Sequence, residues 1–191
     1  VSYELYNADV FNFDFREIAN QNPDQNILVI GNPPWVTNSG LGKNDGVNLP
    51  VKGNINKTKG IEAITGKGNF DIAESICNQI IDAFSHHGNT HIALLVKNSV
   101  VKNIIHRQHF HPRRIQDVRQ LVFDAKKEFN VSVPASLFEC HIGNDCQKEC
   151  ISYDFYTKRI THSFGWVNEA FVSNIQDYGR TSFLDGQSPL I

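Results

Sequence analysis

The chain has 191 residues, of which 40% are hydrophobic and 20% are charged, a composition typical of a globular protein with a buried core. The formal net charge of −2 argues neither for nor against a nucleic-acid partner. No apolar run approaches the ~20 residues of a membrane span, and no signal-peptide pattern opens the chain. We therefore expect no membrane partner and a cytoplasmic protein.

Strands and helices are predicted to alternate along the first part of the chain. Residues 3–14 have the pattern of a strand that carries an acid, Asp9, and residues 16–21 predict a short helix. Residues 27–30 form an aliphatic run typical of a buried strand, and the prolines that follow end it because they cannot donate to a ladder. Residues 38–69, rich in Gly, Asn and Lys, predict a long loop with a functional role.

A helix is predicted over residues 70–87, because apolar residues recur there at helical spacing, with Asp71 as the N-cap and Gly88 beyond the end. The next predicted elements are a strand over 91–100, helices over 100–109 and 112–119, and a strand over 119–125. A further strand is predicted over 129–142, with Pro134 at a bulge or edge. The last predicted strand, over 150–158, could pair with the strand over 129–142 as a hairpin. This order predicts an α/β fold with a mostly parallel sheet and an antiparallel portion at one edge.

The stretch ILVIGNPPWVT, residues 27–37, places a rigid polar motif at the carboxyl end of a predicted strand, where ligands bind in open α/β sheets. Asn32 offers a side-chain carbonyl and Pro33 a backbone carbonyl, and two neighbouring acceptors suit an amino group with two hydrogens. Trp35 offers a face on which a flat ring can stack. These residues favour a planar, amino-bearing ligand such as a nucleobase, and the alternative is a turn with a buried tryptophan.

The four cysteines do not form a metal-binding pattern. Cys77 falls in the predicted helix and is expected to pack in the core. The stretch CHIGNDCQKEC, residues 140–150, lacks a C-x-x-C pair, and its first members lie on a predicted strand where neighbours point to opposite faces. We therefore expect no metal site.

The NPPW motif after a hydrophobic strand resembles motif IV of the S-adenosylmethionine-dependent amino-methyltransferases, particularly the DNA adenine-N6 enzymes of restriction–modification systems. The motif also occurs in enzymes that methylate RNA guanine or a protein glutamine, so by itself it implies methylation of a planar amine. Three further stretches resemble motifs of the adenine-N6 enzymes: NADVF with Asp9 and Val10 resembles motif III, NFDIAESI with Phe70 and Asp71 resembles motif V, and DAKKEFNVSVPASLFEC with Phe129 resembles motif VIII.

The resemblance implies a Rossmann-like methyltransferase fold with a partial doubly wound sheet, S-adenosylmethionine as cofactor and double-stranded DNA as substrate. It assigns catalysis to Asn32, Pro33, Pro34 and Trp35. It further implies that Trp35 and Phe129 stack on an adenine that has been swung out of the duplex. The residues that it implies in cofactor binding are Asp9, Val10, Asn32, Phe70 and Asp71.

The resemblance is incomplete, because the family's glycine-rich motif I and the acid that holds the cofactor ribose are absent from the 191 residues. It implies that residues 1–160 are the C-terminal part of a catalytic domain and that residues 161–191 lead toward a target-recognition domain. The missing strands would lie in the middle of the sheet, so we expect residues 3–10 to be displaced and this stretch alone to be inactive. The implied partner is the rest of the polypeptide, with the cofactor motifs, the recognition domain and any fused nuclease.

Two alternatives stay open at this point. The same chemistry could act on RNA or on a protein glutamine. A chain of this kind could also bind nucleic acid without turnover, although an intact NPPW motif argues against that interpretation.

Basic charge is concentrated downstream of NPPW. Residues 38–69 hold five lysines against two acids, and residues 97–120 hold six Lys and Arg against one acid. This concentration suits a phosphate backbone, and solvated loop and helix faces are the alternative. The predicted DNA-backbone contacts are Lys43, Lys52, Lys57, Lys59, Arg107, Arg113 and Arg114.

Overall fold

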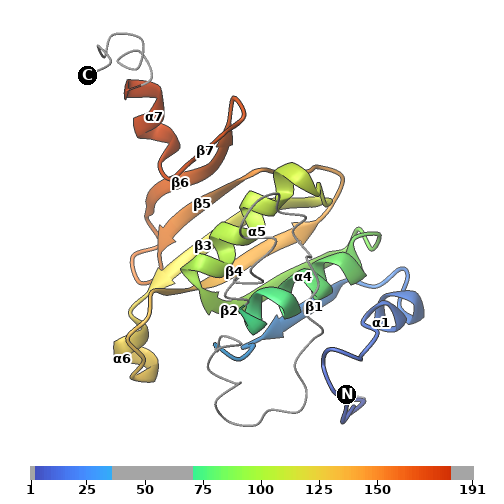
Figure 1. The fold of residues 1–191 in the computed structure, drawn as a ribbon. Coiled ribbons are helices and arrows are strands. Elements are labelled where there is room, and N and C mark those ends of the chain that lie inside the picture. Colours follow the sequence, from blue (N-terminus) through green and yellow to red (C-terminus); the bar gives the residue numbers. More distant parts are fainter. Residues whose placement is uncertain (1–2, 36–70, 182–191) are drawn as a thin grey trace, which may run out of the picture.

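The computed structural model describes residues 3–35 and 71–181, with side chains up to residue 178. The strands are β1 (Ile27–Gly31), β2 (Thr90–Lys97), β3 (Ile115–Phe123), β4 (Ala135–Ile142), β5 (Glu149–Asp154), β6 (Ile160–Val167) and β7 (Ala170–Val172). The helices are α1 (Arg16–Gln21), α4 (Ile72–Phe84), α5 (Asn98–Phe110), α6 (Ala125–Phe129) and α7 (Ile175–Thr181). The seven strands form one sheet in the order β1-β2-β4-β3-β5-β6-β7 (Figure 1).

Most strands of this sheet run in the same direction. The β1–β2 and β3–β5 pairs are parallel, and the other four neighbouring pairs are antiparallel. It follows that β1, β2, β3, β5 and β7 point one way, while β4 and β6 point the other way. The predicted α/β class with a mostly parallel sheet is confirmed, and the fold is consistent with a Rossmann-like methyltransferase. An antiparallel edge is present at β6, but the insertion of β4 between β2 and β3 was not predicted.

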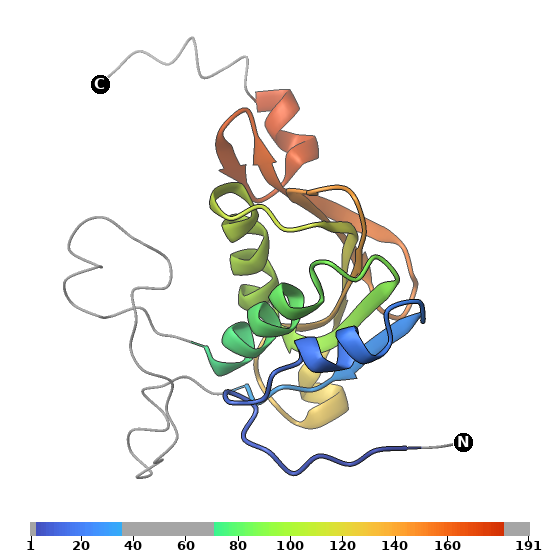
Figure 2. The same ribbon diagram turned by 90° about the vertical axis from the view of Figure 1, so that its right-hand side faces the viewer.

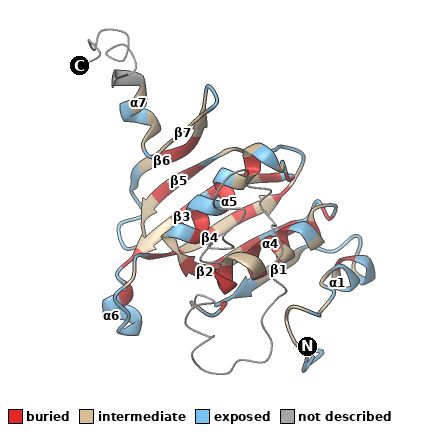
Figure 3. Cartoon of the chain, in the orientation of Figure 1, coloured by how far each residue is buried: buried red, intermediate tan, exposed pale blue. Residues whose placement is uncertain are grey.

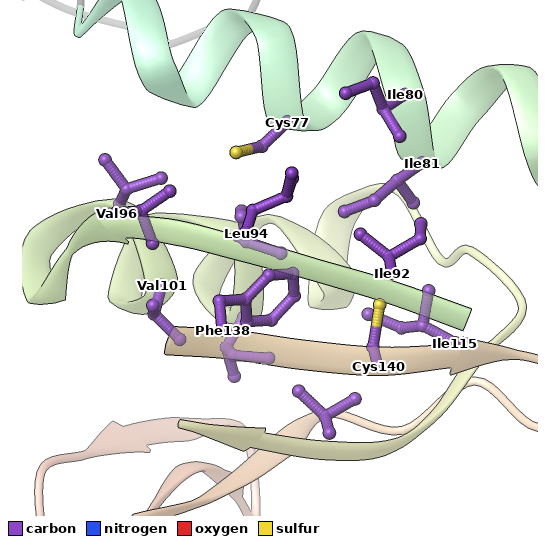
Figure 4. Close-up of a cluster of buried hydrophobic side chains, with 14 of the residues drawn as sticks. Cys77, Ile80, Ile81, Ile92, Leu94, Val96, Val101, Ile115, Phe138 and Cys140 are labelled. Atoms are coloured by element: carbon purple, nitrogen blue, oxygen red, sulfur yellow. The ribbon is translucent and has the colours of Figure 1, made fainter. Parts of the chain in front are cut away.

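One face of the sheet is covered by α4 and α5, which lie side by side on it (Figure 2). The stripe of apolar residues predicted for α4 is buried throughout, and its members are Ile72, Ile76, Ile80, Ile81 and Phe84. In the core, Ile80 and Ile81 face Ile92 and Leu94 of β2 (Figure 4). The predicted helices of α1, α4 and α5 are therefore confirmed, with ends that differ by a few residues.

The opposite face of β1 is apolar and exposed. Leu28 and Ile30 are 65% and 72% exposed, whereas Ile27 and Val29 pack against the core (Figure 3). Among the described residues β1 pairs with β2 alone, so the outer edge of β1 is open there. An aliphatic strand with these features is typical of a sheet that is covered on both faces.

The first predicted strand is wrong, because residues 3–9 form no strand. Tyr3 and Leu5 are 88% and 90% exposed, and no described strand pairs with this segment. The segment is displaced from the sheet, as we expected.

The predicted helix over residues 112–119 is also wrong, because β3 begins there. Ile115 and Val118 are buried, and a bulge between Gln116 and Arg119 shifts the register of β3 against β4. The predicted hairpin between the last two strands is wrong as well. Since both edges of β4 are occupied by β2 and β3, β5 pairs in parallel with β3 instead.

The strand predicted over residues 129–142 begins only at Ala135. Pro134 has no N–H to donate to a ladder, and Phe129 ends the short helix α6. The predicted domain boundary after residue 160 falls at the start of β6, which continues the same sheet by pairing with β5.

Candidate active site

The NPPW motif follows β1 directly at the carboxyl end of the sheet, where Gly31 pairs with Leu94 of β2. Pro33 is buried, while Asn32 and Pro34 are exposed. The Asn32 side chain makes no hydrogen bond with any other described residue. An exposed amide on a backbone anchored by a buried proline is free to bind a ligand.

Trp35 is fixed to the end of β2. Its indole Nε1 donates to the Leu95 carbonyl oxygen at 3.1 Å. The ring packs, with Leu95 and Phe155, against a small buried cluster of Phe123, Ala125 and Ala135. The chain thus brings the carboxyl ends of β1, β2 and β3 together around one half-buried aromatic ring.

Phe129 is the second predicted stacking residue, and it lies next to Trp35. Their ring centroids are 6.0 Å apart with an interplanar angle of 80°, so the rings meet edge to face. A flat ring held between two parallel rings would need centroids about 7 Å apart, which is twice the optimal carbon–carbon separation. Phe129 is 47% exposed at the end of a five-residue helix, so it is the ring free to turn and open such a slot.

Asp71 lies at the start of α4 and is engaged on both carboxylate oxygens. Oδ1 accepts from the Ala73 backbone N–H at 3.0 Å, and Oδ2 is 2.6 Å from the Lys97 ammonium. The two side chains are 10% and 16% exposed, so this ion pair is nearly buried. Asp71 is therefore a helix cap joined to the end of β2. Lys97 was not predicted as a site residue, although a lysine at the end of an apolar strand was the signal.

Asp9 and Val10 lie in a turn of the N-terminal segment. The Asp9 carboxylate accepts from the Phe11 N–H and the Asn12 side chain, both at 3.0 Å. Val10 packs against the main core rather than against the cluster around Trp35. The remaining predicted cofactor residue, Phe70, and the predicted DNA contacts Lys43, Lys52, Lys57 and Lys59 lie outside the described residues.

The prediction that Arg113 contacts DNA is wrong. The residue is 8% exposed, and its guanidinium donates to the side chains of Asn78 and Gln108 and to the Ile104 carbonyl. Burial lowers the pKa of Arg113 from its ordinary value. Its hydrogen-bonding groups are already used within the fold, so none remains for a phosphate.

Arg114 and Arg107 do not lie beside the NPPW motif. Arg114 is exposed and donates to Asn144 at 3.1 Å. It directly precedes β3, and the other end of that strand, Phe123, belongs to the cluster around Trp35. The nine residues of β3 span roughly 26 Å at ~3.3 Å per residue. Arg107 lies in the last turn of α5, and its Nε is buried without a hydrogen-bond partner among the described residues.

The thiols play no visible part at this end of the sheet. Cys77, Cys140 and Cys150 are buried, and burial raises the pKa of Cys140 to about 12. Within residues 3–35 and 71–181, no three His, Cys, Asp or Glu side chains are grouped so that they could hold a metal ion. None of the helices in these two ranges is long and apolar enough to cross a membrane.

The mixed α/β fold with its seven-stranded sheet is consistent with a Rossmann-like methyltransferase. The chain is similar to the type II methyltransferase M.NspV of Nostoc sp. (strain ATCC 29411 / PCC 7524), with 38% identity over 138 residues. The matched stretch is 72% of this chain and 28% of the relative, so the chain spans little more than a quarter of that protein's length. No family model and no solved structure matches the chain.

Proposed function

We propose that the complete protein is a site-specific DNA methyltransferase of a restriction–modification system that modifies the N6 amino group of adenine. The observation that carries this proposal is the exposed, unpaired Asn32 beside the Trp35–Phe129 pair at the carboxyl end of β1. The similarity to a type II methyltransferase supports the reaction class. The resemblance of NPPW to motif IV supports a planar amine as the acceptor.

Asn32 and Pro33 would bind the amino group that is methylated. The Asn32 side-chain oxygen and the Pro33 carbonyl accept its two hydrogens, which localises the lone pair on nitrogen and fixes its direction. Pro34 stiffens the backbone between these acceptors and Trp35, because its φ is fixed. The acceptors are held before the substrate arrives, so positioning and electrostatic preorganisation would supply most of the acceleration.

Trp35 and Phe129 would hold the target base after it leaves the duplex. Extruding a nucleotide costs a few kcal/mol, and stacking on an aromatic ring returns roughly 1–3 kcal/mol per base. Trp35 is restrained by its hydrogen bond to Leu95, whereas Phe129 is 47% exposed and makes edge-to-face contacts with Trp35 and Phe123. Phe129 would therefore swing from its edge-to-face contact to cover the incoming base.

S-adenosylmethionine, when bound, supplies the methyl group. The residues proposed to hold it are Asp9, Val10, Asn32, Phe70 and Asp71. Asp9 fits this role, because each of its carboxylate oxygens accepts one hydrogen bond and keeps a second lone pair free. Asp71 fits it indirectly, since its two oxygens are engaged and it acts by holding the start of α4.

The remainder of the polypeptide would complete this site. Leu28 and Ile30 offer an exposed apolar face, and β1 offers an open edge to a further strand. The relative is more than three times as long as the matched stretch, which supports a longer polypeptide with room for such a layer and for a target-recognition domain. In this proposal residues 1–160 are the C-terminal part of the catalytic domain, and residues 161–191 lead toward the recognition domain.

The test is methyl transfer from labelled S-adenosylmethionine to unmethylated bacterial DNA, with the modified nucleosides identified. The complete protein is compared with its Asn32→Ala variant and with Asn144→Ala, which removes an exposed asparagine bonded to Arg114 away from the site. We expect N6-methyladenine from the protein and from Asn144→Ala. Asn32→Ala should be at least ~100-fold slower, the scale on which one preorganised hydrogen-bonding group acts.

Other products would correct the proposal in defined ways. N4-methylcytosine would keep the reaction and change the base. No DNA product from a folded protein would contradict DNA as the substrate, and the assay would then be repeated with RNA and with a protein glutamine.

A further inference from the structure

Exposed cations gather on α6 and on the turn between β5 and β6. Figure 1 shows α6 projecting from the sheet at the end of β3, and Figure 3 shows that its surface is largely exposed. The cations of this surface, called here the lysine rim, are Lys126, Lys127, Lys158 and Arg159. None of them forms an ion pair with another described residue. The rim therefore presents positive charge to solvent.

The acids beside the rim are already engaged. Asp124 accepts from the backbone N–H groups of Lys126 and Lys127 as the N-cap of α6. Asp154 accepts from the N–H and hydroxyl of Thr157, which lowers the pKa of that carboxyl. Glu128 accepts from the Tyr156 hydroxyl at 2.8 Å. All three carboxylates serve local structure, and none forms an ion pair with a cation of the rim. Their charges remain, so the four cations against these three acids leave a net charge of +1 there.

Two aromatic rings hold ammonium groups at the rim. The Lys127 Nζ lies 4.7 Å from the centroid of the Tyr156 ring, and the Lys158 Nζ lies 4.0 Å from the centroid of the Phe155 ring. Lys158 has a left-handed backbone with φ 58°, an uncommon conformation for a non-glycine residue. The turn that imposes it is stabilised by the Asp154 hydrogen bonds, so the charge is presented by an ordered loop.

The rim is continuous with the candidate active site. Phe155 and Phe129 both contact Phe123, with ring centroids 5.9 and 5.8 Å apart respectively. Phe129 in turn contacts Trp35. Phe123 is 7% exposed, so these ring contacts run through the core and fix the exposed lysines close to the aromatic rings of the site. Cations placed beside stacking rings are typical of sites that bind a nucleic-acid strand.

We propose that the lysine rim binds the phosphate backbone of the strand that carries the target base. This inference rests on the proposed function and deepens it, because it places the DNA strand on the α6 side of the site. Lysine contacts to phosphate give affinity and position without reading sequence. In this proposal the rim takes the phosphate-binding role that was predicted for Arg113 and Arg114. Arg113 is buried, and Arg114 lies at the other end of β3.

The test is the salt dependence of DNA binding by the complete protein, measured as the slope of log K against log salt concentration. The variant Lys126→Ala/Lys127→Ala/Lys158→Ala should lower the magnitude of that slope by about 1 for each phosphate that it no longer neutralises. Replacement of the same lysines by arginine should keep the slope. A charge-matched control, Arg16→Ala/Lys102→Ala/Lys148→Ala, removes three cations away from the rim and should leave the slope unchanged.

Two outcomes would overturn this inference. One is an unchanged slope for the triple-alanine rim variant, and the other is an equal decrease in the charge-matched control, which would indicate a net-charge effect. Failure of the proposed function is separate, since it would show as the absence of methylated DNA with the unaltered protein. Thermal unfolding of each variant verifies that the exposed substitutions leave the fold intact.

Discussion

The two ends of the sheet both carry polar side chains, but they use them in opposite ways. At the amino end of β3, the Arg113 guanidinium is buried and donates to Asn78, Gln108 and a backbone carbonyl. At the carboxyl end of β1, Asn32 is exposed and makes no hydrogen bond with the described residues. A closed network stabilises the fold, whereas an open donor or acceptor on rigid backbone is available for recognition.

The largest loss of stability is expected for Arg113→Ala. Removing the guanidinium leaves the Asn78 side-chain oxygen without its donor in the core and breaks the ion pair with Asp82, so the free energy of unfolding should fall by about 3–5 kcal/mol. Urea unfolding followed by tryptophan fluorescence measures this change. The exposed neighbour provides the control, since Arg114→Ala should stay within about 0.5 kcal/mol. Similar losses for the two variants would contradict the closed network.

A smaller loss is expected when the buried ion pair at the carboxyl end is broken. Lys97→Met leaves the Asp71 carboxylate without its partner, and the expected loss is about 2 kcal/mol. In the double variant Lys97→Met/Asp71→Asn no charge is left unpaired, so part of the loss should return. Unfolding of the two single variants and the double variant measures the coupling. A coupling of zero would show that the pair does not join α4 to β2.

At Phe129 we expect a small loss of stability and a large loss of activity. Its ring is 47% exposed, so Phe129→Ala should cost less than about 1 kcal/mol of stability. Removal of a stacking interaction worth ~1–3 kcal/mol should nevertheless slow methylation roughly 5- to 150-fold. Phe110→Ala is the control, because Phe110 is 59% exposed and contacts His106 and Trp166 instead. Equal rates for the two variants would remove Phe129 from the site.

Local patterns in the sequence predicted the fold class and the elements with strong periodicity. The stripe of α4 and its Asp71 cap were readable because spacing and capping act over a few residues. The resemblance assigned Trp35 and Phe129 to one site and the structure shows their rings in contact, while their stacking on a base stays a prediction. In contrast, β4 lies antiparallel between β2 and β3, and β5 pairs in parallel with β3. These pairings depend on which strand edges are free, and no local pattern contains that information.

The error at Arg113 and the missed role of Lys97 have one physical origin. Arg113 falls in a predicted helix and Lys97 in a predicted strand, and the sequence does not say which basic side chain turns inward. Arg113 finds partners on α4 and α5, while Lys97 finds its partner at the start of α4. A basic residue is assigned to a surface by default, and only the tertiary partners correct this assignment.

The smallest effect is expected at Glu74, which lies between the two ends in the first turn of α4. Burial raises the pKa of Glu74, although the Asn103 side chain donates to it at 2.7 Å. The folded protein therefore holds this proton more tightly than the unfolded chain, and stability is lost as the pH rises from the unfolded pKa through the raised folded pKa.

Glu74→Gln keeps an acceptor for Asn103 without the charge, so it should be slightly more stable near pH 7. That gain should shrink toward pH 4, where the carboxyl is mostly protonated in both states, and unfolding midpoints between pH 4 and 8 measure it. A gain for Glu74→Gln that is the same at pH 4 and pH 7 would mean that desolvation of the charge is not its cause.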